Sequence, residues 1–225
     1  MEKLAREARR LMRLLDGDDS HLASALLTVD ILAVLYGSVM DLNCDKDDRD
    51  QFYLSRGHGP MGYYGVLAAI GQIEVADLYE FGTFRGRLGH HPDRARVPAF
   101  GISAGSLGHG LGIASGTALA RNIRQQQGRV FVLAGDAEMD EGSVWESVAF
   151  AGRTGLANLR LIVADNSSAS LGWPGGLESR LILEGWAAIR VDGSDFAAME
   201  GAFSADGDRK PSAIIVDVPS AGPRK

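Results

Sequence analysis

Two apolar segments of this sequence each end in a side chain that can bind a metal ion. Asp136 follows the run 130–134 after one glycine, and Asn166 follows the run 159–164 after one aspartate. Because the carboxyl ends of parallel strands line the same crevice, both side chains are expected in one site. A carboxylate and a carboxamide oxygen suit a small, hard cation such as Mg²⁺, which takes its other ligands from phosphate and water. Either residue alone is common at a strand end, so the rest of the chain has to support this interpretation.

The sequence around these two residues resembles the thiamine diphosphate motif of transketolase. The resemblance is carried by Gly-Asp at 135–136, Glu-Gly at 141–142 and Asp-Asn at 165–166. It implies that Gly135 and Ala137 contact the diphosphate of the cofactor. The family's usual Gly-Asp-Gly reads Gly-Asp-Ala here, and the methyl group of Ala137 fits only if its backbone φ is negative.

The same resemblance implies a magnesium site that also binds the cofactor. Asp136 and Asn166 would bind Mg²⁺ through their side chains and Ser168 through its backbone carbonyl, and diphosphate oxygens and a water would complete the octahedron. Ca²⁺ or Mn²⁺ could substitute for Mg²⁺. The family glutamate that matches Glu141 joins a proton network between the two active sites of a dimer, so Glu141 is predicted to be catalytic.

Two histidines lie in connections that precede predicted helices. His21 stands before the helix 22–39, and the structural interpretation is a surface histidine beside the helix cap Ser20. The transketolase resemblance instead implies contact with substrate hydroxyls, although the text from His21 reads His-Leu-Ala-Ser where the family has two glycines. His58 lies between two glycines on a tight turn, where it could be purely structural. Its segment, 48–59, resembles the family signature whose histidine contacts the cofactor diphosphate.

A glycine-rich segment at 82–92 ends in two histidines. A His-His pair can bind metal, but no third ligand stands at the spacing of a structural zinc site. The transketolase pattern has Gly-His-Pro here, so His91 before Pro92 is the counterpart, with a role in binding substrate hydroxyls and the developing oxyanion. His90 occupies the position of the glycine. His90 and His109, which stands where the family has glutamine, are predicted to be replaceable.

A second glycine-rich segment, 101–112, opens the predicted helix 107–126. Glycines before a helix N-terminus let backbone N–H groups approach a phosphate, although close helix packing uses glycine too. The segment resembles the transketolase sequence Ser-Thr-Gly-Ser-Leu-Gly-Gln-Gly-Leu. By that resemblance Gly105, Ser106 and Leu107 line the cofactor, with Leu107 against its pyrimidine ring.

Helical and strand-like segments alternate along the chain. The periodicity predicts an α/β fold, a parallel sheet with helices on both faces. By resemblance it is the diphosphate-binding (PP-type) domain of thiamine diphosphate enzymes, formed as a single domain by residues 1–225. Helices are predicted at 3–16, 22–39, 60–71, 74–82, 107–126, 141–154, 177–185 and 195–204, and strands near 51–54, 129–134, 159–164, 187–191 and 212–217.

Composition narrows the classes of partner. The 225 residues are 45% hydrophobic and carry a net charge of −6, which argues against nucleic acid. The basic N-terminal helix could suggest a membrane surface, but a core stripe of Leu4, Ala8, Leu11 and Leu15 under a solvated face explains it better. No apolar stretch is long enough to span a membrane. One cysteine, Cys44, suits a reducing compartment, so a cytoplasmic protein is expected.

The resemblance covers about residues 18–218 and only the diphosphate-binding domain of transketolase. It implies the N-terminal subunit of a split enzyme that transfers a two-carbon ketol unit from a ketose to an aldehyde. A partner chain would supply the pyrimidine-binding domain, in a heterotetramer with two copies of each chain. The alternatives are a related thiamine diphosphate enzyme of a biosynthetic pathway, with a non-sugar donor or acceptor, and a non-catalytic subunit that retains the fold.

Overall fold

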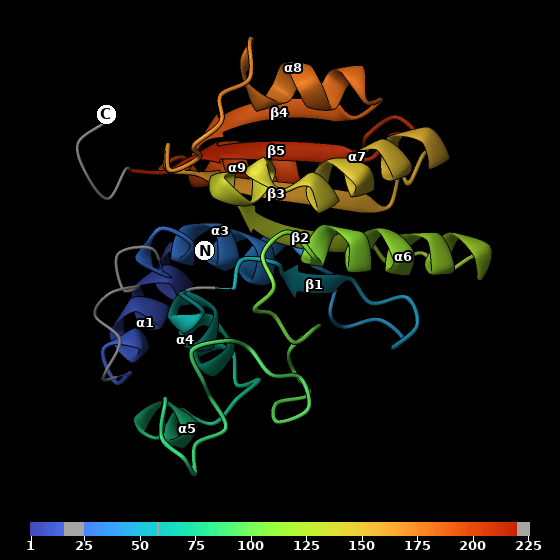
Figure 1. Cartoon of the computed structure of the whole chain (residues 1–225). Coiled ribbons are helices and arrows are strands. Elements are labelled where there is room, and N and C mark those ends of the chain that lie inside the picture. The colour runs from blue at the N-terminus through green and yellow to red at the C-terminus, as the bar shows by residue number, and fades with distance from the viewer. Residues whose placement is uncertain (16–24, 58, 220–225) are drawn as a thin grey trace.

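The computed structural model describes residues 1–15, 25–57 and 59–219, and within them a five-stranded sheet forms the centre (Figure 1). The strand order is β1-β2-β3-β5-β4, and every neighbouring pair is parallel. The predicted α/β fold with a parallel sheet is confirmed. The strands are β1 (Gln51–Leu54), β2 (Val130–Gly135), β3 (Leu159–Asp165), β4 (Ala187–Asp192) and β5 (Ser212–Asp217).

Helices cover both faces of the sheet, because successive side chains of a strand point to opposite faces. In β2, Phe131 and Leu133 face one core, and Val130, Val132 and Ala134 face the other. The first core is closed by α1 (Glu2–Met12), α3 (Val29–Val34), α4 (Met61–Ala69), the small outlying α5 (Val75–Tyr79) and α9 (Phe196–Ser204). The second is closed by α6 (Gly110–Ile123), α7 (Gly142–Thr154) and α8 (Gly176–Leu183). No helix in the described part of the chain is long and apolar enough to cross a membrane.

The predicted helix 22–39 is not continuous over its described part. A turn at Leu27–Thr28 interrupts it, α3 follows, and the last residues, Leu35–Val39, form a π-helix. The turn closes because both the backbone N–H and the hydroxyl of Thr28 donate to the carbonyl of Ala25, at 3.2 and 2.9 Å. Apolar periodicity alone could not reveal this interruption, since the sequence stays rich in apolar residues on both sides of the turn and both Ala25 and Val29 are buried.

Two other helix boundaries also differ from the prediction. Helix α1 ends at Met12, and its buried face consists of Ala5, Ala8, Leu11 and Met12, while Leu4 and Leu15 are only partly buried. Helix α6 begins at Gly110, three residues later than predicted. The preceding loop contains Gly105 and Gly108 with positive φ, 153° and 78°, which an α-helix does not allow.

Candidate functional site

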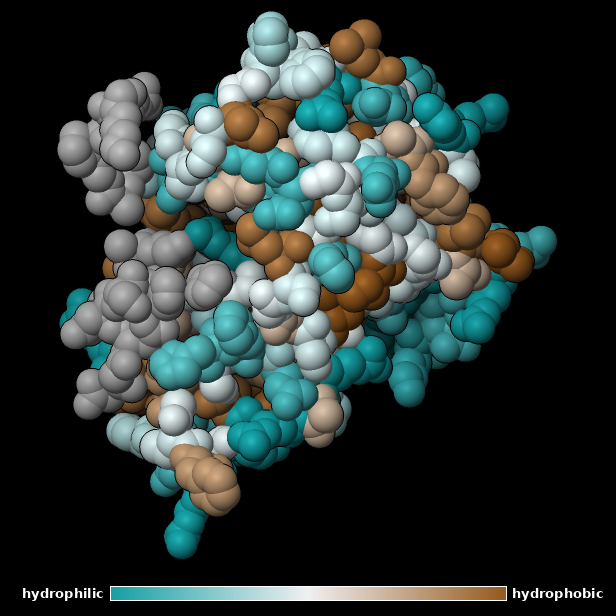
Figure 2. Space-filling view, in the orientation of Figure 1, coloured by the Kyte–Doolittle hydropathy of each residue, from teal (hydrophilic) through white to brown (hydrophobic). Residues whose placement is uncertain are grey.

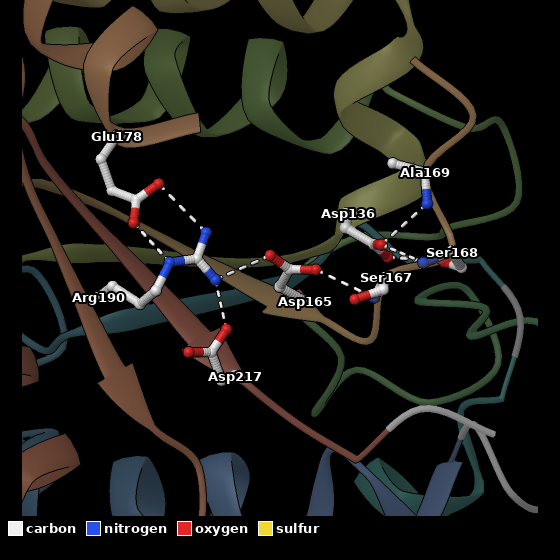
Figure 3. Close-up of polar contacts among 8 residues, drawn as sticks. All are labelled: Asp136, Asp165, Ser167, Ser168, Ala169, Glu178, Arg190 and Asp217. Carbon is white, nitrogen blue, oxygen red and sulfur yellow. Dashed lines mark hydrogen bonds and ion pairs between the residues drawn. The ribbon is translucent and has the colours of Figure 1, made fainter. Parts of the chain in front are cut away.

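The Asp136 carboxylate lies directly after β2 and is almost completely buried, at 3% exposure. It accepts hydrogen bonds from the backbone N–H of Ser168 at 2.5 Å, the Ser168 hydroxyl at 2.7 Å and the backbone N–H of Ala169 at 2.9 Å (Figure 3). Strands β2 and β3 are neighbours, and Gly135 pairs with Ala164. The predicted adjacency of the two strand ends is therefore present, and Asp136 holds the loop that follows β3.

Asn166 supplies an oxygen with an unmet bonding capacity. Its side-chain Oδ1 is buried and has no hydrogen-bond partner among the described residues. An unpaired buried acceptor costs about 1–3 kcal/mol, so such an atom needs a partner that the protein itself does not provide. A hard cation is such a partner. The carboxylate of Asp136 and the Oδ1 of Asn166 therefore fit the donor set of a magnesium site.

The residues after Asp136 form a short 3₁₀-helix, Asp136–Asp140, that the sequence analysis did not predict. Ala137 lies inside this helix and its φ is not positive, so its methyl group fits the backbone at the position where the family has glycine. This helix borders a cavity of 130 Å³ whose lining includes four of the residues predicted to bind the cofactor. The lining residues are Arg56, Gly57, Leu107, Gly135, Asp136, Ala137, Glu138 and Ser168.

Two charged residues of this cavity had no predicted role. Arg56 lies beside Gly135, and burial lowers the pKa of its guanidinium while the charges of Glu138 and Asp136 raise it. Burial raises the pKa of the Glu138 carboxyl, and hydrogen bonds from Ser55, Gly135 and Gly108 oppose that shift. One cation beside two carboxylates leaves this cavity with a net negative charge, which favours a divalent cation over a bare anion.

A larger cavity of 550 Å³ adjoins the segment that carries His91. The His91 Nδ1 lies 2.6 Å from the carbonyl oxygen of Gly57. A carbonyl only accepts, so Nδ1 carries the proton and Nε2 is the basic nitrogen of the neutral ring. Gly105 packs on the same imidazole, since a Cβ added to it would lie 3.7 Å from the His91 Cγ. His91, Gly105 and Ser106 are thus brought together, as predicted for one site.

The other predicted residues are placed as follows. Leu107 is 42% exposed at the smaller cavity, and His109 lines the larger one together with His91. Glu141 is the N-cap residue of α7, and its Cβ lies only 2.8 Å from where a Cβ on Gly108 would stand. His21 and His58 lie outside the described residues. The catalytic and binding roles of all these residues stay predictions.

His90 and His91 are adjacent in sequence but differ in environment. The His90 ring packs edge-on against Phe81, with 5.2 Å between ring centroids. We expect His91→Ala to lower kcat roughly 100-fold, because a positioned acid–base group contributes at least that much. His90→Ala and His109→Ala should stay within a few-fold of the wild type. Steady-state kinetics of the three variants tests the ranking, and equal losses in all three would refute it.

An arginine on β4 stabilises the loop that carries Asn166. Arg190 bonds Glu178 at 2.5 Å and Asp165 at 2.9 Å, and it also pairs with Asp217 (Figure 3). Asp165 in turn accepts the backbone N–H of Ser167 at 3.0 Å, and Ser167 has a positive φ of 60°. Arg190 therefore connects the carboxyl ends of three strands and α8 to the turn that places Asn166 and Ser168.

Arg190→Met should lower the free energy of unfolding by about 1–2 kcal/mol near neutral pH, a value reduced for the partial exposure of the arginine. The hydrogen bond with Arg190 lowers the pKa of Glu178, whose ordinary value is 4.5. A depressed carboxyl pKa adds stability that is complete above the unfolded-state value and disappears as pH falls through the folded-state value. The difference between variant and wild type should thus shrink below about pH 4.5.

Urea denaturation at pH 7 and pH 3.5 measures this difference. Arg124→Met, at the end of α6, is the matched control and should leave stability within about 0.5 kcal/mol of the wild type. A loss from Arg190→Met that is equal at both pH values would show that packing of the arginine stem, rather than its charge, supports the loop.

Comparisons with known proteins agree with this geometry. The family described as "Transketolase, thiamine diphosphate binding domain" matches residues 12–218. "Ferredoxin fas2" of Rhodococcoides fascians is 44% identical over 206 residues, which cover 90% of this chain and 68% of that protein. "6-Deoxy-6-sulfo-D-fructose transketolase subunit SqwG" of Clostridium sp. is 30% identical over 210 residues, 88% of this chain and 76% of that protein.

The fold is also shared with solved structures. Transketolase from Campylobacter jejuni superposes with a TM-score of 0.80 at 22% identity, over 97% of this chain and 38% of that chain. The chain likewise spans only 33% of the length of some other curated relatives. The family match covers most of the chain. It shows that this protein belongs to the transketolase family and comprises its thiamine diphosphate-binding domain.

Proposed function

We propose that this chain is the diphosphate-binding subunit of a split transketolase that transfers a two-carbon ketol unit from a ketose to an aldehyde. The observation that carries the proposal is the pairing of a buried carboxylate, Asp136, with the unpartnered Oδ1 of Asn166 at neighbouring strand ends. Both lie within residues 12–218, which match the thiamine diphosphate-binding domain of the family. Mg²⁺ would bind there, with the carbonyl of Ser168 as a further ligand.

The chain's own residues would hold the cofactor and steer protons around it. Gly135 and Ala137 would present backbone N–H groups to the diphosphate, and Leu107 would pack against the pyrimidine ring. Thiamine diphosphate, when bound, supplies the carbon nucleophile for breaking and forming the C–C bond. His91 would accept a hydroxyl proton at Nε2, because its Nδ1 proton is engaged by the carbonyl of Gly57. His21, His58 and Glu141 keep their predicted catalytic roles within this proposal.

A partner subunit would complete the site. The relative SqwG is named a transketolase subunit, and this chain spans about a third of the longer relatives. Exposed apolar side chains lie on the helices next to the cavities: Ile113 and Ile123 on α6 and Phe150 on α7. Figure 2 shows hydrophobic surface over this region of the molecule. Such a surface suits a pyrimidine domain that covers the larger cavity.

The proposal is tested by reconstituting the chain with a pyrimidine-domain subunit, which is to be sought first among the neighbouring reading frames. We expect ketol transfer from a ketose phosphate or sulfonated ketose to an aldehyde, dependent on both thiamine diphosphate and a divalent cation. The name of the relative SqwG motivates the sulfonated donor. A reconstituted complex that binds no thiamine diphosphate would refute the proposal. A complex that binds it but accepts no ketose would favour the alternative, a related enzyme with a non-sugar donor or acceptor.

A second candidate is oxidation of the two-carbon unit, with water, to a carboxylate, so that two electrons pass to one-electron acceptors and no carbon unit passes to an aldehyde. It is motivated by the name of the relative with 44% identity, a ferredoxin. Iron–sulfur clusters need several thiolates, and this chain has one cysteine, so any cluster would have to be held by another polypeptide or segment. Ketose-dependent reduction of a one-electron dye, without formation of a longer ketose, would support this candidate over ketol transfer.

A further inference from the structure

Glu138 is the most buried carboxylate next to the predicted cofactor site, at 1% exposure, and no role follows for it from the family motif. Its two oxygens accept three hydrogen bonds. Oε1 accepts the hydroxyl of Ser55 at 2.6 Å and the backbone N–H of Gly108 at 3.1 Å, and Oε2 accepts the backbone N–H of Gly135 at 3.0 Å. All three partners are donors, an arrangement that suits the carboxylate form, which accepts at both oxygens.

The three donors belong to three separate segments of the chain. Ser55 directly follows β1 and precedes Arg56 and Gly57, Gly108 lies near the end of the glycine-rich loop before α6, and Gly135 is the last residue of β2. These same segments supply most of the residues that line the two cavities. The side chain of Glu138 therefore lies where three walls of the site meet: the end of β1 (51–57), the glycine-rich loop (104–110) and the end of β2 (130–137).

Ser55 extends the same contact to helix α6. Its hydroxyl donates to Glu138 and accepts the backbone N–H of Gly110 at 3.1 Å. The start of α6 sits directly on this serine, since a Cβ added to Gly110 would lie 2.3 Å from the Ser55 hydroxyl oxygen. The glycine-rich loop is thereby fixed at both ends, at Gly108 by Glu138 and at Gly110 by Ser55.

We propose that Glu138 is a positioning residue that sets the relative placement of the β1 end, the glycine-rich loop and the β2 end around the cofactor. The inference rests on the proposed function and adds a residue to it. Glu138 need not touch the cofactor. It fixes the spacing between Gly105–Leu107 on one wall and Gly135–Ala137 on the other, and a bound molecule has to bridge both walls. A displacement of one wall relative to the other loses contacts on both.

The test uses Glu138→Gln, which conserves shape but gives up one acceptor. Its amide nitrogen would face a backbone N–H donor, so at least one wall is released. We expect the Kd of the complex with the pyrimidine-domain partner for thiamine diphosphate, at saturating Mg²⁺, to rise about 10- to 100-fold. Hydrogen exchange measured without cofactor should rise together in peptides covering 51–57, 104–110 and 130–137.

Two further variants separate positioning from general stability. Ser55→Ala should raise exchange in 51–57 and 104–110 but not in 130–137, and it should weaken binding less than Glu138→Gln does. Asp140→Asn is the matched control, because Asp140 accepts the backbone N–H groups of Ser170 and Leu171 in a different loop. It should raise exchange only there. If Glu138→Gln does not fold, the Ser55→Ala pattern decides the question.

A Glu138→Gln chain that is folded, binds thiamine diphosphate within twofold of the wild type and exchanges faster only at 135–138 would overturn the inference. Failure of the wild-type chain to bind thiamine diphosphate in the complex with its pyrimidine-domain partner would instead count against the proposed function. The hydrogen-exchange pattern, measured without cofactor, would then still report whether Glu138 couples the three walls.

Discussion

Replacing Asp136 with asparagine should weaken the binding of magnesium and thiamine diphosphate roughly 100-fold or more, because even outer-shell metal partners are worth 10–100-fold. The loss has two causes. The variant removes the negative charge that a divalent cation requires. It also places an amide N–H₂ group among the donors of Ser168 and Ala169, which now bond the carboxylate. The turn that carries the predicted ligands Asn166 and Ser168 should therefore shift as well.

Asparagine is preferable to alanine at this position because alanine would leave a void and three unsatisfied donors in a buried place. The natural control is Asp140→Asn. Both aspartates lie on the same 3₁₀-helix and both hold the loop after β3, but Asp140 does not line the smaller cavity. Calorimetric titration with Mg²⁺ and thiamine diphosphate should show a loss for Asp136→Asn and a change within about threefold for Asp140→Asn. Comparable losses in both would assign the effect to the loop and not to a metal ligand.

The fold and the pairing of the two strand ends could be predicted because each depends on local pattern. Apolar runs such as 130–134, and 159–164 with Arg160 as its one charged residue, are typical of strands that are buried on both faces. All five strands lie close to the segments predicted as strands. Once the sheet is parallel, residues that follow neighbouring strands have to meet at one edge. The placement of Asp136 and Asn166 at neighbouring strand ends follows from this pattern, whereas their role as metal ligands rests on the family resemblance and stays a prediction.

The residues that reinforce the site could not be predicted, because their partners are distant in sequence. Ser55 and Glu138 are 83 positions apart, and Asp165 and Arg190 are 25 positions apart. A buried glutamate looks like any surface glutamate in the sequence, and only the packed structure shows three donors around it. The prediction of a continuous helix at 22–39 was wrong for a related reason. The backbone N–H and the hydroxyl of Thr28 close a turn within an otherwise apolar stretch.

The chain alone should turn over ketose substrates at least about 100-fold more slowly than the complex with a pyrimidine-domain subunit. The acid–base group of that subunit would be missing, and one such group typically accelerates a reaction by about 100-fold or more. The residues that line the two cavities come from the ends of β1 and β2, from loops, from the 3₁₀-helix and from the start of α6. Apart from Leu107, which would pack against the pyrimidine ring, the predicted site residues among them would contact the diphosphate end of the cofactor or the substrate hydroxyls. By family resemblance a partner subunit would contribute the glutamate that activates the aminopyrimidine ring. The complex is expected to be a heterotetramer with two copies of each chain.

Two exposed isoleucines allow the interface itself to be located. Ile113 on α6 lines the larger cavity and is 47% exposed, whereas Ile189, on the edge strand β4, is 52% exposed. Ile113→Glu should abolish assembly and with it the gain in turnover, since a charge would be buried against an apolar partner surface. Ile189→Glu should assemble and react like the wild type. Mass measurement in solution and the ketol-transfer assay report both effects. High turnover by the lone chain would show that the acid–base group does not come from a partner. Assembly that survives Ile113→Glu and fails with Ile189→Glu would place the interface at β4 instead of α6.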